Sequence, residues 1–252
     1  MQIIFPDTPH IDLLKALWKE AFGDSEEFIE GFFSSAFGFD RCLCAVENKE
    51  VMGMLYWFDC SYNDKQIAYI YSVATSKAHR GKKICHKLMD YTHNYLKDKG
   101  YSGTILVPGS EELFGFYESM GYKTSCYVRE FSYSAGEEVK VYRINKDEYA
   151  QLRRKLLPES GIIQENENID FLDTQAEFYK GDGFLLAADK EDDILSGVEF
   201  LGDEKKAPGI IAALGCKTGK FRMPGKEKPF AMFYPFNNEY NSLPEYFGLA
   251  FD

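Results

Sequence analysis

The first part of the chain switches between helical and strand-like spacing of its hydrophobic residues. Apolar side chains recur at helical spacing from Asp7 to Phe22 and again after Asp24, which predicts two helices. The apolar segments that come next alternate like strands and are separated by polar turns. They occupy residues 41–46, 51–62 and 66–73. Two helices followed by an antiparallel meander are therefore expected.

A longer amphipathic helix is predicted from about Lys82 to Lys99, where Gly100 is a suitable stop signal. A buried strand, a short helix and a last strand follow, over residues 104–107, 110–120 and 122–133. This order of elements predicts an α/β (α+β) fold, with a mixed, largely antiparallel sheet and helices on both of its faces.

The pattern starts again after a polar boundary near Ala135, which indicates a diverged internal repeat. A short strand and two helices come first, over residues 139–144, 145–157 and near 169–179; then residues 184–203 match 42–59, and residues 221–225 match 105–109. We therefore predict two tandem halves, residues 1–134 and 135–252. The second half has no basic turn that opens a helix, because Lys217–Lys220 leads into a strand-like run.

Charge and composition exclude several classes of protein. The chain has 252 residues, a net charge of −11 and a pI near 5.0, which argues against nucleic acid as a partner and favours cationic substrates such as amines. No apolar run is long enough for a membrane helix, and the N-terminus lacks the basic and apolar segments of a secretory signal. We expect a cytoplasmic protein without membrane contact, and its oligomeric state stays open.

The cysteines and histidines do not form a recognisable metal site. Several of the six cysteines fall in strand-like apolar runs, and none has zinc-site spacing, so neither disulfides nor a metal is expected. His86 and His93 lie on one helix face, which is more typical of surface histidines than of metal ligands. The aromatic cluster between Phe230 and Tyr240 is more typical of a core than of an acceptor pocket.

A basic turn joins the third predicted strand to the long helix. Arg80, Lys82 and Lys83 lie on this turn, although the chain as a whole is acidic. Unpaired N–H groups and the positive end of the helix dipole meet at such a place, and Gly81 allows a close backbone approach. A solvated, lysine-rich helix start is the alternative, but it leaves the charge unexplained because cations at a helix N-terminus oppose the dipole. The turn therefore predicts a phosphate site.

Two motifs resemble the GNAT superfamily of N-acetyltransferases. Arg80–Cys85 is similar to the family's pyrophosphate loop, Arg/Gln-x-x-Gly-x-Gly/Ala, although Lys83 and Cys85 stand where Gly and Gly/Ala are expected. Leu113–Tyr122 is similar to its closing signature, aromatic-Tyr-x-x-x-Gly-aromatic. The resemblance covers roughly residues 1–133, and it implies the GNAT fold and acetyl-coenzyme A as co-substrate.

The resemblance also implies roles for particular residues. Backbone groups of Val73, Ala74 and Thr75 would pair with the pantetheine arm, and the pyrophosphate would lie on Arg80, Gly81, Lys82, Lys83, Ile84 and Cys85. Tyr117 would be the general acid that returns a proton to the leaving thiolate. The plainer alternatives are the end of a central strand for residues 72–75 and a core aromatic for Tyr117. The implied reaction is direct acetyl transfer to a primary amine of a small molecule or peptide.

Neither the general base nor catalysis itself follows from the sequence. Asp59 and Asp64 are candidates for the base only because they are near in sequence, and Asp252, at the end of an apolar tail, is another; a buried closing strand is the plainer explanation of that tail. A non-catalytic acyl-coenzyme A sensor remains an alternative, which the missing base and Lys83 favour. An aminoacyl transferase is disfavoured by the acidic charge.

Overall fold

The structure is a computed structural model, and it describes residues 1–237, 240 and 242–251. Its first half closely follows the predicted order of elements. The elements are β1 (Gln2–Ile4), α1 (Ile11–Phe22), α2 (Glu26–Ser35), β2 (Cys42–Glu47), β3 (Glu50–Tyr62), β4 (Lys65–Thr75), α3 (Ile84–Asp98), β5 (Gly103–Leu106), α4 (Glu111–Glu118) and β6 (Lys123–Ser134).

The second half differs more from the prediction. Its elements are β7 (Tyr142–Ile144), α5 (Lys146–Leu156), β8 (Ile163–Gln164), α6 (Glu167–Leu172), β9 (Glu177–Gly181), β10 (Phe184–Glu191), β11 (Ile194–Gly202), α7 (Ala207–Ala213), β12 (Thr218–Pro224) and β13 (Lys228–Pro235). The helix predicted over residues 169–179 is wrong at its end, because residues from Glu177 onwards form β9. There Phe178 stacks on Tyr149 of α5, whereas Tyr179 packs in the cluster around α7, so successive side chains are buried on opposite faces.

Local signals explain the helix boundaries. Ser25 caps α2 by accepting a hydrogen bond from the Phe28 N–H at 3.1 Å, and Asn145 caps α5 in the same way from the Glu148 N–H at 2.9 Å. α1 ends at Gly23, whose φ of 78° is the left-handed conformation that glycine adopts most easily.

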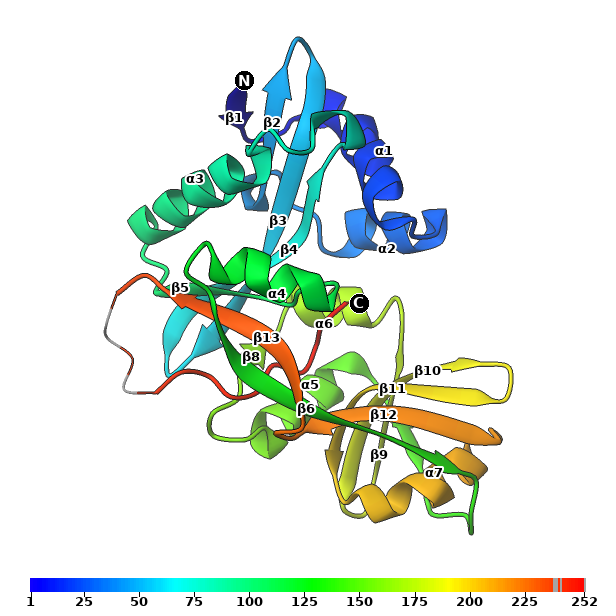
Figure 1. Cartoon of the computed structure of the whole chain (residues 1–252). Coiled ribbons are helices and arrows are strands. Elements are labelled where there is room, and N and C mark those ends of the chain that lie inside the picture. The colour runs from blue at the N-terminus through cyan, green and yellow to red at the C-terminus, as the bar shows by residue number, and fades with distance from the viewer. Residues whose placement is uncertain (238–239, 241, 252) are drawn as a thin grey trace.

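One continuous sheet crosses both halves (Figure 1). Its strand order is β1-β2-β3-β4-β5-β13-β6-β12-β11-β10-β9-β7, with β8 paired to β3. On this path only β4–β5 and β11–β12 are parallel pairs among the described strands. The last strands are exchanged at the centre, since β13 pairs with β5 and β6 pairs with β12. The predicted fold class, a largely antiparallel mixed sheet flanked by helices, is confirmed.

Helices cover both faces of this sheet. In the first half, α1 and α2 lie on one side of β3 and β4, and α3 lies on the other (Figure 1). Trp18 and Phe32 of the first pair belong to the main apolar core, which continues under α5 and α6 of the second half. Leu88 of α3 packs with Trp57 in a second cluster, and a third cluster lies around α7. Phe230 and Phe233 are buried in the main core, as expected.

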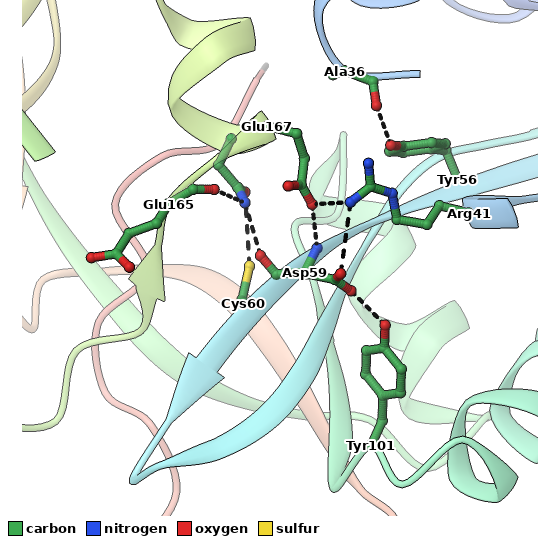
Figure 2. A network of polar contacts seen from close by, with 9 residues as sticks. Ala36, Arg41, Tyr56, Asp59, Cys60, Tyr101, Glu165 and Glu167 are labelled. Atoms are coloured by element: carbon green, nitrogen blue, oxygen red, sulfur yellow. Dashed lines mark hydrogen bonds and ion pairs between the residues drawn. The ribbon is translucent and has the colours of Figure 1, made fainter. Parts of the chain in front are cut away.

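A polar network joins the two halves beside the meander (Figure 2). The Arg41 Nη1 donates to Glu167 Oε1 at 2.6 Å and lies 3.6 Å from Asp59 Oδ2. The Glu167 carboxylate also accepts from the Asp59 N–H at 2.9 Å, while Tyr101 donates to the Asp59 side chain at 2.5 Å. Arg41 and Asp59 belong to the first half and Glu167 to the second, so this network stabilises their contact.

The chain returns to the first half through a buried tail, residues 246–251. These residues are buried as predicted, but they form no closing strand, since the tail has only one isolated bridge, between Gly161 and Tyr246. Instead, the side chain of Gln164 bonds the backbone of Leu249 twice, as donor to its carbonyl at 2.6 Å and as acceptor from its N–H at 3.0 Å. A side-chain amide thus replaces the strand partner that the tail lacks.

The sequence pattern predicted that His93 lies on the surface, but the structure buries it. It is 9% exposed, its Nε2 lies 2.8 Å from the Tyr122 hydroxyl, and its ring stacks on Tyr234 at 4.7 Å. Burial lowers the pKa of His93 to about 4, so the ring is neutral at pH 7. Among the described residues no cluster of His, Cys, Asp and Glu could hold a metal ion, and no helix is long and apolar enough to cross a membrane.

Candidate functional site

The parallel strands β4 and β5 separate soon after they meet. They pair only at Ala68 with Thr104 and at Tyr69 with Ile105. Beyond this point the register of β4 against β3 shifts, and Ser72 takes a positive φ of 47°, so β4 carries a bulge. Over residues 70–75, β4 therefore has no strand partner on its β5 side within the described part of the chain. Its backbone groups are available there to a ligand.

Two adjoining cavities fill the opening between β4 and β5. The outer cavity, of about 700 Å³, extends from the end of β4 past the basic turn to the start of α3. The inner cavity, of about 450 Å³, lies deeper between the two strands and reaches α1 and α2. Four residues line both: Phe22, Val73, Gly109 and Leu113. The two cavities therefore form one cleft, with a basic end and an aromatic end.

Nearly all residues predicted for coenzyme binding lie in the outer cavity. Its lining includes Val73, Ala74, Thr75, Arg80, Gly81, Lys83, Ile84 and Cys85. Lys82 is exposed and is not among the lining residues. Tyr117 lines the inner cavity instead. The predicted loop and the predicted acid therefore line adjoining parts of one cleft.

The backbone of the basic turn explains its glycine pattern. Gly81 has a φ of 77°, and a side chain there would meet nothing within 4 Å. Lys83 caps α3 with a φ of 58°, which lies in the left-handed region, and the pyrophosphate loop of the GNAT superfamily has Gly at this position. The left-handed conformation costs a non-glycine residue about 1 kcal/mol. The Arg80 Nε donates to the Thr75 carbonyl at 3.4 Å. This hydrogen bond holds the turn against the end of β4.

Burial sets the protonation of two groups in the cleft. It raises the pKa of the Cys85 thiol to about 12, so this thiol is neutral and unsuited to be an acyl-accepting nucleophile. Burial, with a smaller contribution from Cys85, also raises the pKa of Tyr117 above that of an ordinary phenol. The Tyr117 hydroxyl has no hydrogen-bond partner among the described residues, and its proton is retained at neutral pH. A protonated hydroxyl without a partner in the described part of the chain can donate a hydrogen bond to a group bound in the cleft.

Asp24 is a cavity residue that the sequence did not reveal. It lies in the loop between α1 and α2, lines the inner cavity and accepts a hydrogen bond from Trp18 Nε1 at 2.7 Å. Within the described lining of that cavity it is the only carboxylate. Asp59 and Asp64 line neither cavity, and Asp59 is held in the network of Figure 2. Asp252 lies outside the described residues.

Phe251 is the residue of the second half that lines the inner cavity within the described part of the chain. Its carbonyl accepts a hydrogen bond from the Tyr71 hydroxyl at 3.1 Å, and its ring lies 4.7 Å from that of Phe171 in α6. Phe251 lines the inner cavity together with Ser72 of the β4 bulge. The predicted burial of the apolar tail could have suggested this contact, but not its position.

Comparison with known proteins supports the resemblance. Residues 7–125 match the family model described as acetyltransferase (GNAT) domain. The fold is similar to that of GCN5-related N-acetyltransferases from Kribbella flavida, with a TM-score of 0.68 at 16% identity over 93% of this chain and 70% of that one, and from Anabaena variabilis, with 0.70 at 13% over 94% and 73%. No curated protein matches the sequence.

A third comparison covers both chains almost completely. A protein of Pyrococcus horikoshii has a TM-score of 0.65 at 16% identity, over 99% of this chain and 94% of that one. The architecture thus recurs as a whole in a distant sequence. The chain therefore has the GNAT fold, and its residues 7–125 match the acetyltransferase domain.

Proposed function

We propose that the protein is an acetyl-coenzyme A-dependent N-acetyltransferase that transfers the acetyl group directly to a primary amine of a small molecule or peptide. One observation carries this proposal: a basic, glycine-containing turn lines the outer part of a cleft, and Tyr117 lines its inner part. The domain match over residues 7–125 supports acyl transfer as the class of reaction.

The outer cavity fits the coenzyme part of this proposal. The pyrophosphate would lie against the turn, where Gly81 leaves open space and the first N–H groups of α3 have no helical partner. Arg80 and Lys83 would add positive charge. The pantetheine arm would run along Val73–Thr75, whose edge has no strand partner on the β5 side among the described residues.

The inner cavity would hold the reacting groups. The neutral amine attacks the thioester carbonyl, the C–S bond breaks, and an amide and a thiolate result. Tyr117 would protonate the thiolate, and the proton that the attacking nitrogen releases would pass through solvent and restore the Tyr117 hydroxyl. Asp24, fixed by Trp18, would first bind the ammonium form of the acceptor in the cavity, and this form would release one proton to solvent to give the neutral amine. The acidic net charge of −11 would steer cationic acceptors to the protein.

We further propose that residues 1–134 and 135–252 are two GNAT-like halves in tandem. The sheet path supports this, because each half contributes one parallel pair that lies next to the exchanged central strands. By position, β10 and β11 correspond to β3 and β4. The second half would hold no coenzyme, since the turn before α7 contains Glu204–Lys206 and no glycine.

A non-catalytic acyl-coenzyme A-binding protein is the second candidate. Two observations favour it: Lys83 replaces a glycine of the loop, and the one described carboxylate of the inner cavity, Asp24, is already bonded to Trp18. Such a protein would bind the coenzyme without releasing its thiol.

Thiol release with a panel of primary amines, together with calorimetry of acetyl-coenzyme A binding, separates the two candidates. The enzyme predicts release, and it predicts that Tyr117→Phe lowers kcat roughly a hundredfold or more while coenzyme affinity is unchanged. Tyr133→Phe, an exposed tyrosine on β6 outside both cavities, is the matched control and keeps wild-type rates. Tight coenzyme binding without release by any amine would contradict the enzyme and favour the sensor.

A further inference from the structure

A third cavity, of about 570 Å³, lies on the second half of the sheet. We name it the distal cavity. Its lining comes from β6, β11, β12, α6, the loop after α6 and the tail, and comprises Glu130, Phe131, Ser132, Leu172, Gln175, Ser196, Gly197, Val198, Lys220, Phe221, Arg222, Ala250 and Phe251. Phe251 also lines the inner cavity, so one side chain borders both spaces.

The distal cavity lies where the second parallel pair separates. β11 and β12 pair from Ile194 with Thr218 to Gly197 with Phe221, and no further pair joins them among the described residues. An extra residue in β11, Val198, shifts its register against β10 at this point. The inner cavity has the same relation to β4 and β5, which separate beside the bulge of β4. The two cavities are thus counterparts in the two halves, and Phe251 of the tail lines both.

The walls of the distal cavity are polar and basic on one side. Gly219 and Phe221 of β12 face α7, because a side chain at Gly219 would meet Ile211. Lys220 and Arg222 alternate with them and therefore lie on the cavity face. There Ser132 of β6 pairs with Lys220 of β12. Two cations, with serine hydroxyls beside them, can bind an anion by charge-assisted hydrogen bonds.

The two cations of the distal cavity, Arg222 and Lys220, differ in the groups that lie beside them. Arg222 stacks over Phe230 at 4.4 Å and its Nε lies 3.9 Å from Glu130. Glu130 is in turn bonded by Lys228 at 2.7 Å, so the one carboxylate in the described lining of the distal cavity is already paired. No described carboxylate lies within 4.0 Å of the Lys220 ammonium. Of the two cations that line the distal cavity, Lys220, an exposed residue of β12, is therefore the better placed to bind an incoming anion.

We propose that the distal cavity binds a carboxylate of the acceptor, and that the preferred acceptors are primary amines that carry this carboxylate at the other end of the molecule. The amine reaches the inner cavity past Phe251, and Lys220 binds the carboxylate. This inference rests on the proposed acetyl transfer. The turn before α7 does not resemble the basic turn before α3, because it has Glu204, which bonds Arg129 at 3.1 Å, where the first half has Gly81.

Acceptors that differ only in the carboxylate test the inference. We would compare aminohexanoate with hexylamine, and aminooctanoate with octylamine, in wild type, Lys220→Met and Lys220→Arg. Lys155→Met, which removes the same charge from an exposed position of α5 outside every cavity described above, is the control. Thiol release gives kcat/KM, and calorimetry with coenzyme A present gives acceptor affinity without turnover.

The inference predicts that wild type prefers at least one amino carboxylate to its amine about tenfold in kcat/KM, through a lower KM. Lys220→Met removes this preference and leaves the amine unchanged, Lys220→Arg retains it, and Lys155→Met has no effect. Equal use of each pair by wild type, or an equal loss for both acceptors in Lys220→Met, overturns the inference. If no amine releases thiol, the proposed function fails. Calorimetry then tests the carboxylate site by itself. Tighter binding of an amino carboxylate by wild type than by Lys220→Met supports the site, and equal binding overturns it.

Discussion

Arg153 and Glu199 form a two-point ion pair that is entirely enclosed by the second half. The Arg153 Nε lies 2.7 Å from Glu199 Oε2 and its Nη2 3.0 Å from Oε1, with side chains 2% and 0% exposed. Tyr149 and Tyr246 donate their hydroxyls to the same carboxylate, at 2.7 and 2.9 Å. Because Tyr246 begins the buried tail, this pair also anchors the segment that ends at Phe251 in the inner cavity.

Arg153→Met is expected to lower the free energy of unfolding by about 3–5 kcal/mol, because it leaves a buried carboxylate without its counter-charge. Urea denaturation measures this loss. Arg154→Met is the control: Arg154 pairs with Glu165 at 3.2 Å but is 59% exposed, so its loss should stay within about 1 kcal/mol. Similar small losses in both variants would show that the enclosed pair does not stabilise the fold.

Gly248→Ala tests the fit of the tail against this ion pair. A methyl group at position 248 would overlap the Glu199 carboxylate and contact the Tyr246 hydroxyl. We expect a loss of about 1–3 kcal/mol in the free energy of unfolding, and a lower kcat without weaker coenzyme binding, because the tail must shift. Gly115→Ala, on α4, where nothing lies within 4 Å, should be neutral or slightly stabilising. A neutral Gly248→Ala would contradict the close packing of the tail.

His93 gives the fold a dependence on pH. Its folded pKa of about 4 lies below the ordinary value of 6.5, so the unfolded chain binds this proton more readily. The stabilisation is complete above pH 6.5 and is lost as the pH falls towards 4, by a total on the order of 3 kcal/mol. Unfolding free energies measured from pH 7 to 4 should decline less steeply in His93→Phe. Parallel curves for the two proteins would refute this origin of the decline.

Lys83 and Lys82 are neighbours with different expected roles. Lys83 lines the outer cavity and Lys82 does not. Lys83→Asn keeps a residue that tolerates the left-handed conformation but removes the charge, so acetyl-coenzyme A should bind about three- to tenfold more weakly by calorimetry. Lys82→Asn should bind it as wild type does. Tighter binding by Lys83→Asn would mean that the lysine obstructs the pyrophosphate.

Local pattern was sufficient to predict the strand, turn and helix around the cleft. The run from Val73 to Cys85 combines strand spacing, a glycine and a helix start within a few residues, and Tyr117 lies in a recognisable motif. Such signals depend on neighbours in sequence, and the structure places these residues along one cleft.

Contacts between distant segments could not be predicted in this way. The exchange of β6 and β13 depends on pairing between strands that lie far apart in the sequence, on which hydrophobic spacing has no bearing. His93 was expected on the surface because its partners, Tyr122 and Tyr234, come from other elements. Asp24 likewise becomes a cavity residue only when α1 and α2 pack beside the β4 bulge.

The position of the coenzyme diphosphate in a crystal structure of the complex with coenzyme A tests the central claim most directly. We predict that the diphosphate contacts the N–H groups of Gly81–Ile84, with the pantetheine arm along residues 73–75 and its sulfur directed towards Tyr117. Coenzyme density anywhere else, or none in this cleft at a saturating concentration, would contradict the account.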